Sequence, residues 1–112
     1  MKIYHNNRCG KSRQTLELLK SEGQEPEIIE YLKNPPSEAE LKDILSKLQI
    51  KPEELLRKGE ALFKEKFSGK RFSDDEWITI MVENPILIER PIVINGDKAI
   101  IGRPPENVLK IV

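Results

Sequence analysis

The stretch Lys2–Tyr31, KIYHNNRCGKSRQTLELLKSEGQEPEIIEY, decides the fold of this chain. Its apolar start predicts a short strand over Lys2–His5, and the polar residues Asn6–Gly10 predict a turn. The spacing of apolar side chains predicts a helix over Lys11–Glu22, and a second strand is predicted over Glu27–Tyr31. Because a helix of this length joins the two strands, we expect them to be parallel.

The middle of the chain, residues 37–84, predicts helices only. Ser37 and Glu40 have the spacing of a capping box, in which each side chain accepts a hydrogen bond from the other residue's backbone N–H. Ser73 and Glu76 repeat this spacing. After the first box, apolar residues recur at i, i+3, i+4 and i+7: Leu41, Ile44, Leu45 and Leu48. That period places them on one face of a helix, so we expect an all-helical insertion at about residues 37–84.

The last part of the chain returns to strands. Residues Pro91–Ile94 predict one strand, Asn95-Gly96 predicts a tight turn, and Lys98–Ile101 predicts the partner strand of a hairpin. Pro104 then begins a terminal helix. Three apolar side chains of that helix are expected on its inner side: Val108, Leu109 and Val112. The order of elements, βα-β, then helices, then ββα, predicts one α/β domain over residues 1–112.

The composition excludes several classes of protein. Nineteen basic and nineteen acidic residues give zero net charge, which argues against a nucleic-acid-binding protein. No apolar run of about 18 residues is present, so we expect no membrane-spanning helix and a cytoplasmic protein. The chain has one cysteine and one histidine, too few for a metal-ligand cluster, so we expect no bound metal. With a single cysteine, any redox cycle takes its second thiol from another molecule.

Cys9 is that single cysteine, and it lies between the first predicted strand and the first predicted helix. Backbone N–H groups at a helix start carry partial positive charge, which stabilises a thiolate and lowers its pKa. A free cysteine is more commonly a small buried apolar side chain. Here the basic residues Arg8, Lys11 and Arg13 surround it in a polar turn, so we interpret Cys9 as a reactive thiol.

Two neighbours leave alternatives open. Ser12 occupies the place of the second cysteine of a C-x-x-C motif and cannot resolve a disulfide. Its hydroxyl can donate a hydrogen bond to the thiolate or cap the helix. His5 stands four residues before Cys9, where it either shifts the thiol pKa or faces solvent at the end of the strand.

A thiolate among positive charges suits an oxyanion partner. Cys9 and Arg13 form C-x3-R, so the C-x5-R loop of cysteine phosphatases is not present. Three arginines stand where the chain has just left a predicted element: Arg57, Arg90 and Arg103. Each taken alone fits a solvated surface charge, and their spacing in the sequence does not bring them together.

The order of the elements resembles the thioredoxin fold with a helical insertion between its halves, and Arg90-Pro91 matches the position of the cis-proline of that fold. The chain as a whole resembles the glutaredoxin-coupled arsenate reductase family, an arsenate reductase-like branch of the thioredoxin-fold superfamily. The resemblance is carried by Tyr4-His5-Asn6 with Cys9-Gly10 and Ser12-Arg13, by Tyr31-Leu32 with Asn34-Pro35-Pro36-Ser37, by Leu55-Leu56-Arg57-Lys58, by Asn84-Pro85-Ile86-Leu87-Ile88 with Arg90-Pro91-Ile92-Val93, and by Gly102-Arg103-Pro104.

The resemblance implies a role for each matching residue. Cys9 would be the nucleophile, and His5 would help to keep it a thiolate. Three arginines would hold arsenate and then the arsenic-bound intermediate: Arg57, Arg90 and Arg103. Two residues would lie in the anion-binding turn: Ser12 and Arg13.

The resemblance also implies the partners. Arsenate would be the substrate, glutathione a co-substrate and glutaredoxin the second thiol donor, with no bound cofactor. Two alternatives remain open. One is a glutaredoxin-like thiol transferase that acts on glutathionylated substrates and needs Cys9 but not three arginines. The other is a non-catalytic regulator of the same superfamily that binds RNA polymerase, whose C-x-x-C switch Ser12 interrupts.

Overall fold

The computed structural model describes all residues, Met1–Val112, and divides into two compact units. The sheet unit comprises Met1–Asn34 and Arg90–Val112, and the helical unit comprises Pro35–Glu89. No helix in either unit has the length and apolar character that crossing a membrane requires.

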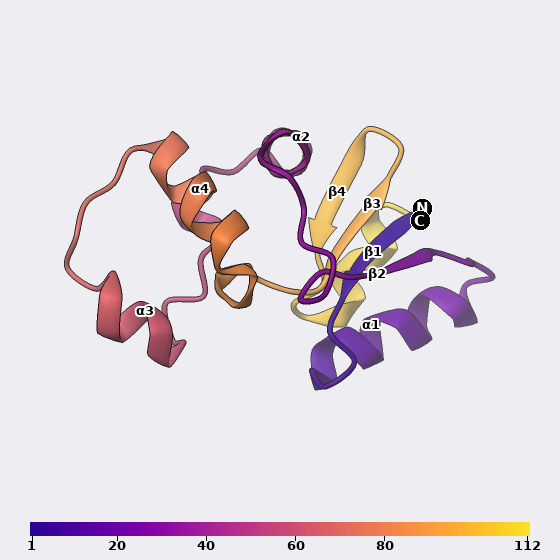
Figure 1. The fold of residues 1–112 in the computed structure, drawn as a ribbon. Coiled ribbons are helices and arrows are strands. Elements are labelled where there is room, and N and C mark those ends of the chain that lie inside the picture. Colours follow the sequence, from indigo (N-terminus) through magenta and orange to yellow (C-terminus); the bar gives the residue numbers. More distant parts are fainter. The chain divides into compact units, whose positions relative to one another are not determined.

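The sheet unit contains four strands: β1 (Lys2–His5), β2 (Glu27–Glu30), β3 (Ile92–Asn95) and β4 (Lys98–Ile101). They lie in the order β2-β1-β3-β4 (Figure 1). The β1–β2 pair is parallel, as the β–α–β opening predicts, and the other two pairs are antiparallel. Gly96, in the predicted turn between β3 and β4, has a φ of 64°, which suits a tight hairpin turn.

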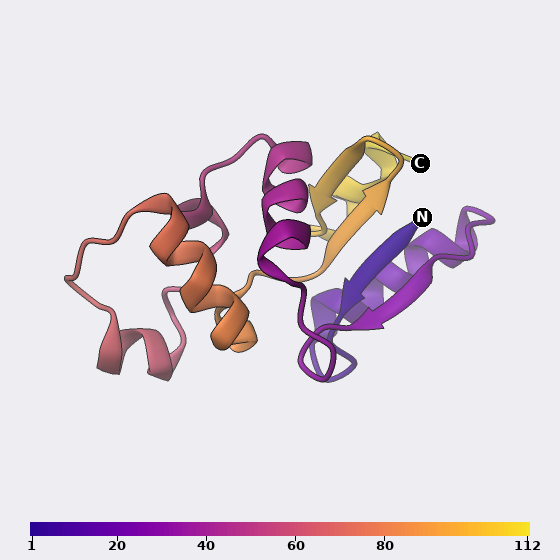
Figure 2. The ribbon, with the colours of Figure 1, turned by 45° about the horizontal axis from the view of Figure 1, so that its top comes forward.

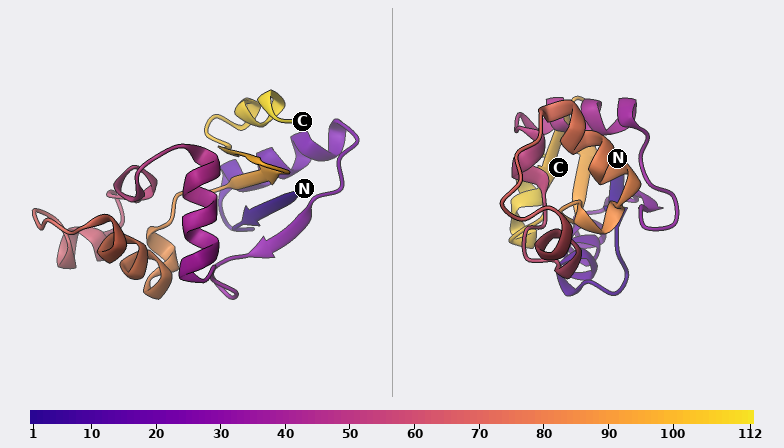
Figure 3. Two further views of the ribbon diagram at one scale, coloured as in Figure 1. Left: turned by 90° about the horizontal axis from the view of Figure 1, so that it is seen from above. Right: turned by 60° about the vertical axis from the view of Figure 1, so that its left-hand side comes forward.

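Helix α1 (Gly10–Ser21) joins β1 to β2, and the 3-10 helix η3 (Pro105–Lys110) ends the unit beside it (Figure 3). Ile3 and Val93 face each other across the β1–β3 pair, so their side chains point to the same side of the sheet. Leu19 of α1 and Val108 of η3 pack against them. All four side chains are fully buried. Both helices therefore cover the same face of the sheet.

The terminal helix differs from its prediction. Val108 is buried as expected, but Leu109 and Val112 are 42% and 44% exposed, so their predicted inner position is wrong. The prediction assumed the period of an α-helix, whereas η3 is a 3-10 helix with about three residues per turn. Ile111, three residues after Val108, takes the place expected of Val112 and packs against the core.

Two peptide bonds before proline are cis, Arg90–Pro91 and Arg103–Pro104. The first agrees with the resemblance to the thioredoxin fold, and the second has no signal in the sequence. Each follows one of the arginines that the sequence analysis singled out.

The helical unit contains no strand, in agreement with the predicted insertion. Its helices are α2 (Glu38–Leu48), η1 (Pro52–Leu55), α3 (Ala61–Lys66), α4 (Asp74–Glu83) and η2 (Pro85–Leu87) (Figure 2). Both predicted capping boxes form, at the starts of α2 and α4. α2 packs against α4, and an aromatic cluster gathers around Trp77. That the whole chain acts as one domain stays a prediction.

Candidate active site

Cys9 occupies the residue immediately before α1, and the turn that carries it is closed by local hydrogen bonds. Its backbone N–H donates to the carbonyl of Asn6 at 3.0 Å, and its carbonyl accepts from the N–H of Arg13 at 3.0 Å. Cys9 is 9% exposed and is the N-cap residue of α1. The sulfur therefore lies at the positive end of α1, as the sequence predicts.

Opposing effects set the pKa of Cys9. Burial raises it, whereas hydrogen bonds from the backbone N–H groups of Ser12 and Lys11 lower it. The positive charge of Arg90 and a hydrogen bond from its side chain lower it further. The lowering effects prevail, so the pKa of Cys9 lies below its ordinary value. This favours the thiolate, the nucleophilic form of cysteine.

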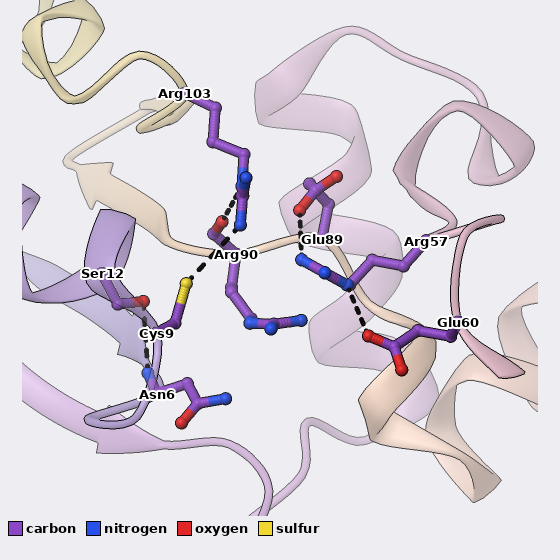
Figure 4. A network of polar contacts seen from close by, with 8 residues as sticks. All are labelled: Asn6, Cys9, Ser12, Arg57, Glu60, Glu89, Arg90 and Arg103. Carbon is purple, nitrogen blue, oxygen red and sulfur yellow. Dashed lines mark hydrogen bonds and ion pairs between the residues drawn. The ribbon is translucent and has the colours of Figure 1, made fainter. Parts of the chain in front are cut away.

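Arg103 also reaches the sulfur (Figure 4). Its Nη2 donates to Cys9 Sγ at 3.5 Å, and its Nε donates to the backbone carbonyl of Arg90 at 2.8 Å. The guanidinium group is thus held between the thiol and the segment that precedes β3. Two of the three arginines that the sequence singled out, Arg90 and Arg103, interact with Cys9 in the sheet unit.

Gly102 fixes the backbone next to Arg103. Its N–H donates to the carbonyl of Pro91 at 2.9 Å, and its carbonyl accepts from the hydroxyl of Thr15 at 3.3 Å. A Cβ at Gly102 would lie 2.6 Å from Thr15 Oγ1 and 2.9 Å from Pro91 Cγ. Only glycine allows this approach. Thr15 is fully buried and was missed by the sequence analysis, because its partner lies 87 residues further along the chain.

The hydroxyl of Ser12 makes a hydrogen bond within the turn, and the roles weighed for it from the sequence stay predictions. It is fully buried and accepts a hydrogen bond from the backbone N–H of Asn6 at 3.3 Å, which ties the start of the turn to α1 (Figure 4). The bond from Ser12 that lowers the Cys9 pKa comes from its backbone N–H. The side chain of Ser12 thus stabilises the turn, and its backbone N–H donates a hydrogen bond to the Cys9 sulfur.

Arg13 supports the same turn from outside. Its Nη1 donates to the carbonyl of Asn7 at 2.9 Å. Arg13 is not among the groups that shift the pKa of Cys9. Arg8 is adjacent to Cys9 in the sequence, but it is not among these groups either.

His5 is 6% exposed and therefore does not face solvent. Burial lowers its pKa; Glu30 opposes this shift, and Arg13 and Lys20 add to it. Its Nδ1 is buried and has no hydrogen-bond partner. No hydrogen bond joins His5 to Cys9, and His5 is not among the groups that shift the thiol pKa. Its role at the thiolate stays a prediction.

Arg57 belongs to the helical unit. An isolated bridge pairs Leu56 with Ile88. Arg57 and Glu89 each follow one of these two residues and lie side by side. Arg57 Nη1 donates to Glu89 Oε1 at 3.0 Å and its Nε to Glu60 Oε1 at 3.1 Å (Figure 4). Neither carboxylate was predicted from the sequence, although Glu60 stands three residues after Arg57. The predicted convergence of Arg57 with Arg90 and Arg103 stays a prediction.

No group of three or more histidine, cysteine, aspartate or glutamate side chains is placed to hold a metal ion. The donors around Cys9 are N–H groups and guanidinium groups, which bind anions and not cations. This arrangement suits an oxyanion beside a thiolate.

A parallel β–α–β opening, an antiparallel hairpin, a cysteine before the first helix and a cis-proline before β3 together define a thioredoxin-like protein with a single reactive thiol. Comparison with known proteins places it more narrowly: the chain belongs to the ArsC family, whose model matches residues 4–111.

Relatives and solved structures agree with this family. The Escherichia coli (strain K12) protein YfgD, described as uncharacterized, is 51% identical over 114 residues that cover 100% of this chain and 96% of that protein. An arsenate reductase of Haemophilus influenzae is 47% identical, with 97% and 96% covered. The solved structure of an arsenate reductase from Vibrio cholerae superposes with a TM-score of 0.95 at 45% identity, with 99% and 96% covered. These matches confirm the thioredoxin-like fold with its helical insertion.

Proposed function

We propose that this protein is an arsenate reductase that works with external thiols in the cytoplasm. The observation that carries the proposal is the surrounding of Cys9: a thiol with a lowered pKa, two backbone N–H groups on its sulfur, and the guanidinium groups of Arg90 and Arg103 beside it. Such a site favours a nucleophile and a bound oxyanion at once. Near-full-length similarity to arsenate reductases supports arsenate as that oxyanion.

The first step forms a sulfur–arsenic bond. The Cys9 thiolate attacks the arsenic of bound arsenate, and an oxygen of arsenate leaves as water after protonation. Arsenic remains in the +5 state. Negative charge builds on the arsenate oxygens during the attack, where Arg90 and Arg103 stabilise it. A preorganised donor of this kind contributes about 10²- to 10³-fold in rate.

Two external thiols then supply the two electrons. Glutathione displaces a second oxygen and binds to arsenic through its sulfur. The thiolate of glutaredoxin attacks that glutathione sulfur and forms a mixed disulfide, and the electron pair of the breaking sulfur–arsenic bond reduces arsenic to +3. Water then releases arsenite and returns Cys9 as a thiol. In sum, arsenate and two thiols give arsenite, one mixed disulfide and one water, because two waters leave and one is consumed. Both thiols come from outside, because the chain has no second cysteine.

Arg57 and His5 complete the proposal. Arg57 is the third oxyanion ligand, and its ion pairs with Glu60 and Glu89 hold the guanidinium in one orientation. His5 helps to keep Cys9 a thiolate. The family resemblance supports this role, and no hydrogen bond joins the two residues.

The test compares two reactions of one preparation. NADPH consumption is followed with arsenate, glutathione, glutaredoxin and glutathione reductase, and then with a glutathionylated peptide in place of arsenate. An arsenate reductase consumes NADPH in an arsenate-dependent way, and omitting glutathione or glutaredoxin stops it. Turnover of the glutathionylated peptide without turnover of arsenate would instead identify a thiol transferase. No turnover of either, with recovery of RNA polymerase subunits in a pull-down, would identify a regulator.

A further inference from the structure

A recess lies beside the turn that carries Cys9. It has a volume of about 290 Å³, close to the lower end of the range for small-molecule sites. It is lined by the end of β1 with the first residues of the turn, residues 5–8, and by Glu30, Leu32 and Lys33. All of these residues belong to the sheet unit. None of them is among the groups that hydrogen-bond to the Cys9 sulfur or shift its pKa, so the recess is lined by other residues than those that surround the sulfur.

The lining carries charges of both signs. Arg8 and Lys33 are exposed cations, and Glu30 is a half-buried anion. Lys33 Nζ lies 3.6 Å from Glu30 Oε2, with side chains 75% and 42% exposed. An ion pair this exposed contributes little and gives way readily to a ligand that bears both charges.

The walls between these charges are suited to a short aliphatic chain. Leu32 is 41% exposed and lines the recess between the charged side chains. His5 is the register partner of Glu30 across β1 and β2, so both side chains lie on the same face of the sheet. Burial lowers the pKa of His5, which favours the neutral ring. The recess thus presents two cations, one anion and an apolar wall.

We propose that this recess binds the zwitterionic amino-acid end of the peptide thiol that reduces the arsenic-bound intermediate. The two cations take its carboxylate, Glu30 takes its ammonium group, and Leu32 contacts the methylene groups between them. This inference rests on the proposed function, because that function requires a thiol from solution. It adds a site for the thiol that is distinct from the arginines around the sulfur.

The reach of such a ligand agrees with the turn geometry. The bond from the Cys9 N–H to the Asn6 carbonyl closes a turn, so the recess residue Asn6 and Cys9 have Cα atoms within about 7 Å. An extended tripeptide spans roughly 10 Å. A peptide thiol held in the recess by one end can therefore bring its sulfur to the arsenic on Cys9.

Binding is measured first without any chemistry. S-methylglutathione, which has no free thiol, is titrated into the isotope-labelled wild-type protein and followed by NMR. We expect shifts of the backbone signals of residues 5–8 and 30–33, and no such shifts from an analogue that lacks the α-amino group. Shifts confined to other residues, or equal shifts from the analogue, would overturn the inference.

Kinetics give an independent measurement. Lys33→Ala and Arg8→Ala are each expected to raise the KM for glutathione about three- to fivefold, the range that an exposed ion pair supports. The KM for arsenate stays unchanged, and so does the rate with 2-mercaptoethanol, which has no charged end. Lys98→Ala, an exposed lysine of β4 outside the recess, is the matched control and leaves the KM for glutathione unchanged. An unchanged KM for glutathione in both recess variants would contradict the site.

The two proposals fail separately. If the wild type reduces arsenate but S-methylglutathione leaves residues 5–8 and 30–33 unshifted, the function stands and the recess is not the thiol site. If S-methylglutathione binds there but arsenate is not reduced with any thiol, the site stands and the proposed function is wrong.

Discussion

Arg103 Nη2 lies 3.5 Å from Cys9 Sγ, although the two residues are 94 positions apart in the chain. The contact depends on the sheet, which brings the end of β4 beside the start of α1. It also depends on Gly102, whose missing side chain lets the backbone before Arg103 approach Thr15. Cys9 and Arg103 are therefore brought together by the fold and not by a local motif.

Arg103→Ala is expected to reduce kcat/KM for arsenate about 10²- to 10³-fold, because it removes one preorganised donor from the oxyanion site. Turnover of a glutathionylated peptide should change less than about threefold, since that reaction develops no oxyanion. The coupled NADPH assay measures both. Arg71→Ala, an exposed arginine of the helical unit, is the control. Equal losses in the two reactions would show that Arg103 serves the thiol alone.

Arg90→Met is expected to raise the pKa of Cys9 toward its ordinary value, because the charge and hydrogen bond of Arg90 lower it in the wild type. In the wild type the thiolate persists until the pH falls through the lowered pKa. In the variant it is already protonated at a higher pH, so iodoacetamide alkylation at pH 7 slows. Arg8→Met should leave the alkylation profile unchanged. A shift with Arg8→Met but none with Arg90→Met would reverse the assignment.

Gly102→Ala is expected to reduce the free energy of unfolding by about 1–3 kcal/mol, the usual effect of overpacking. The added Cβ would meet Thr15 and Pro91 at distances that real Cβ contacts do not show. Gly59→Ala is the matched control, because a Cβ there has no atom within 4 Å. Urea unfolding of the three proteins measures the difference. Equal stability of the Gly102→Ala variant and the wild type would show that the loop before Arg103 is not tightly packed.

His5→Gln is expected to flatten the loss of stability in mild acid. Burial lowers the pKa of His5, so the unfolded chain binds a proton that the folded protein resists. Stability is therefore fully present above the unfolded pKa of about 6.5 and declines as the pH falls below it. Carboxylates also titrate in this range, in both proteins. We therefore compare the change in the free energy of unfolding between pH 7.5 and pH 5 in the wild type with the same change in the variant. A difference of zero would mean that His5 titrates normally in the fold.

Local signals predicted most of the fold. The capping boxes Ser37–Glu40 and Ser73–Glu76 both form, because each bond joins residues only three positions apart. The β–α–β opening was predicted to within one residue at its helix start, since the polar turn and apolar period lie in one continuous stretch. The terminal helix was misjudged at Leu109 and Val112, because the sequence does not tell a 3-10 helix from an α-helix.

The candidate site was predicted in part. The position of Cys9 before a helix followed from local patterns, but the groups that lower its pKa did not. Nearby Arg8 and Arg13 are not among the groups that lower the pKa, whereas Arg90, 81 residues away, lowers it through its charge. Thr15 and Glu89 were missed because their partners lie 87 and 32 positions away. Contacts at such separation depend on sheet topology, which a single sequence indicates only in outline.

The central claim is that Cys9 binds the arsenic of arsenate and that external thiols then reduce this arsenic from the +5 to the +3 state. Its most direct test is to quantify arsenite by chromatography after incubating arsenate with glutathione, glutaredoxin, glutathione reductase, NADPH and either the wild type or Cys9→Ser. We predict one arsenite for each NADPH consumed with the wild type, and no arsenite above the enzyme-free background with Cys9→Ser. Equal amounts of arsenite from the two proteins would contradict the account.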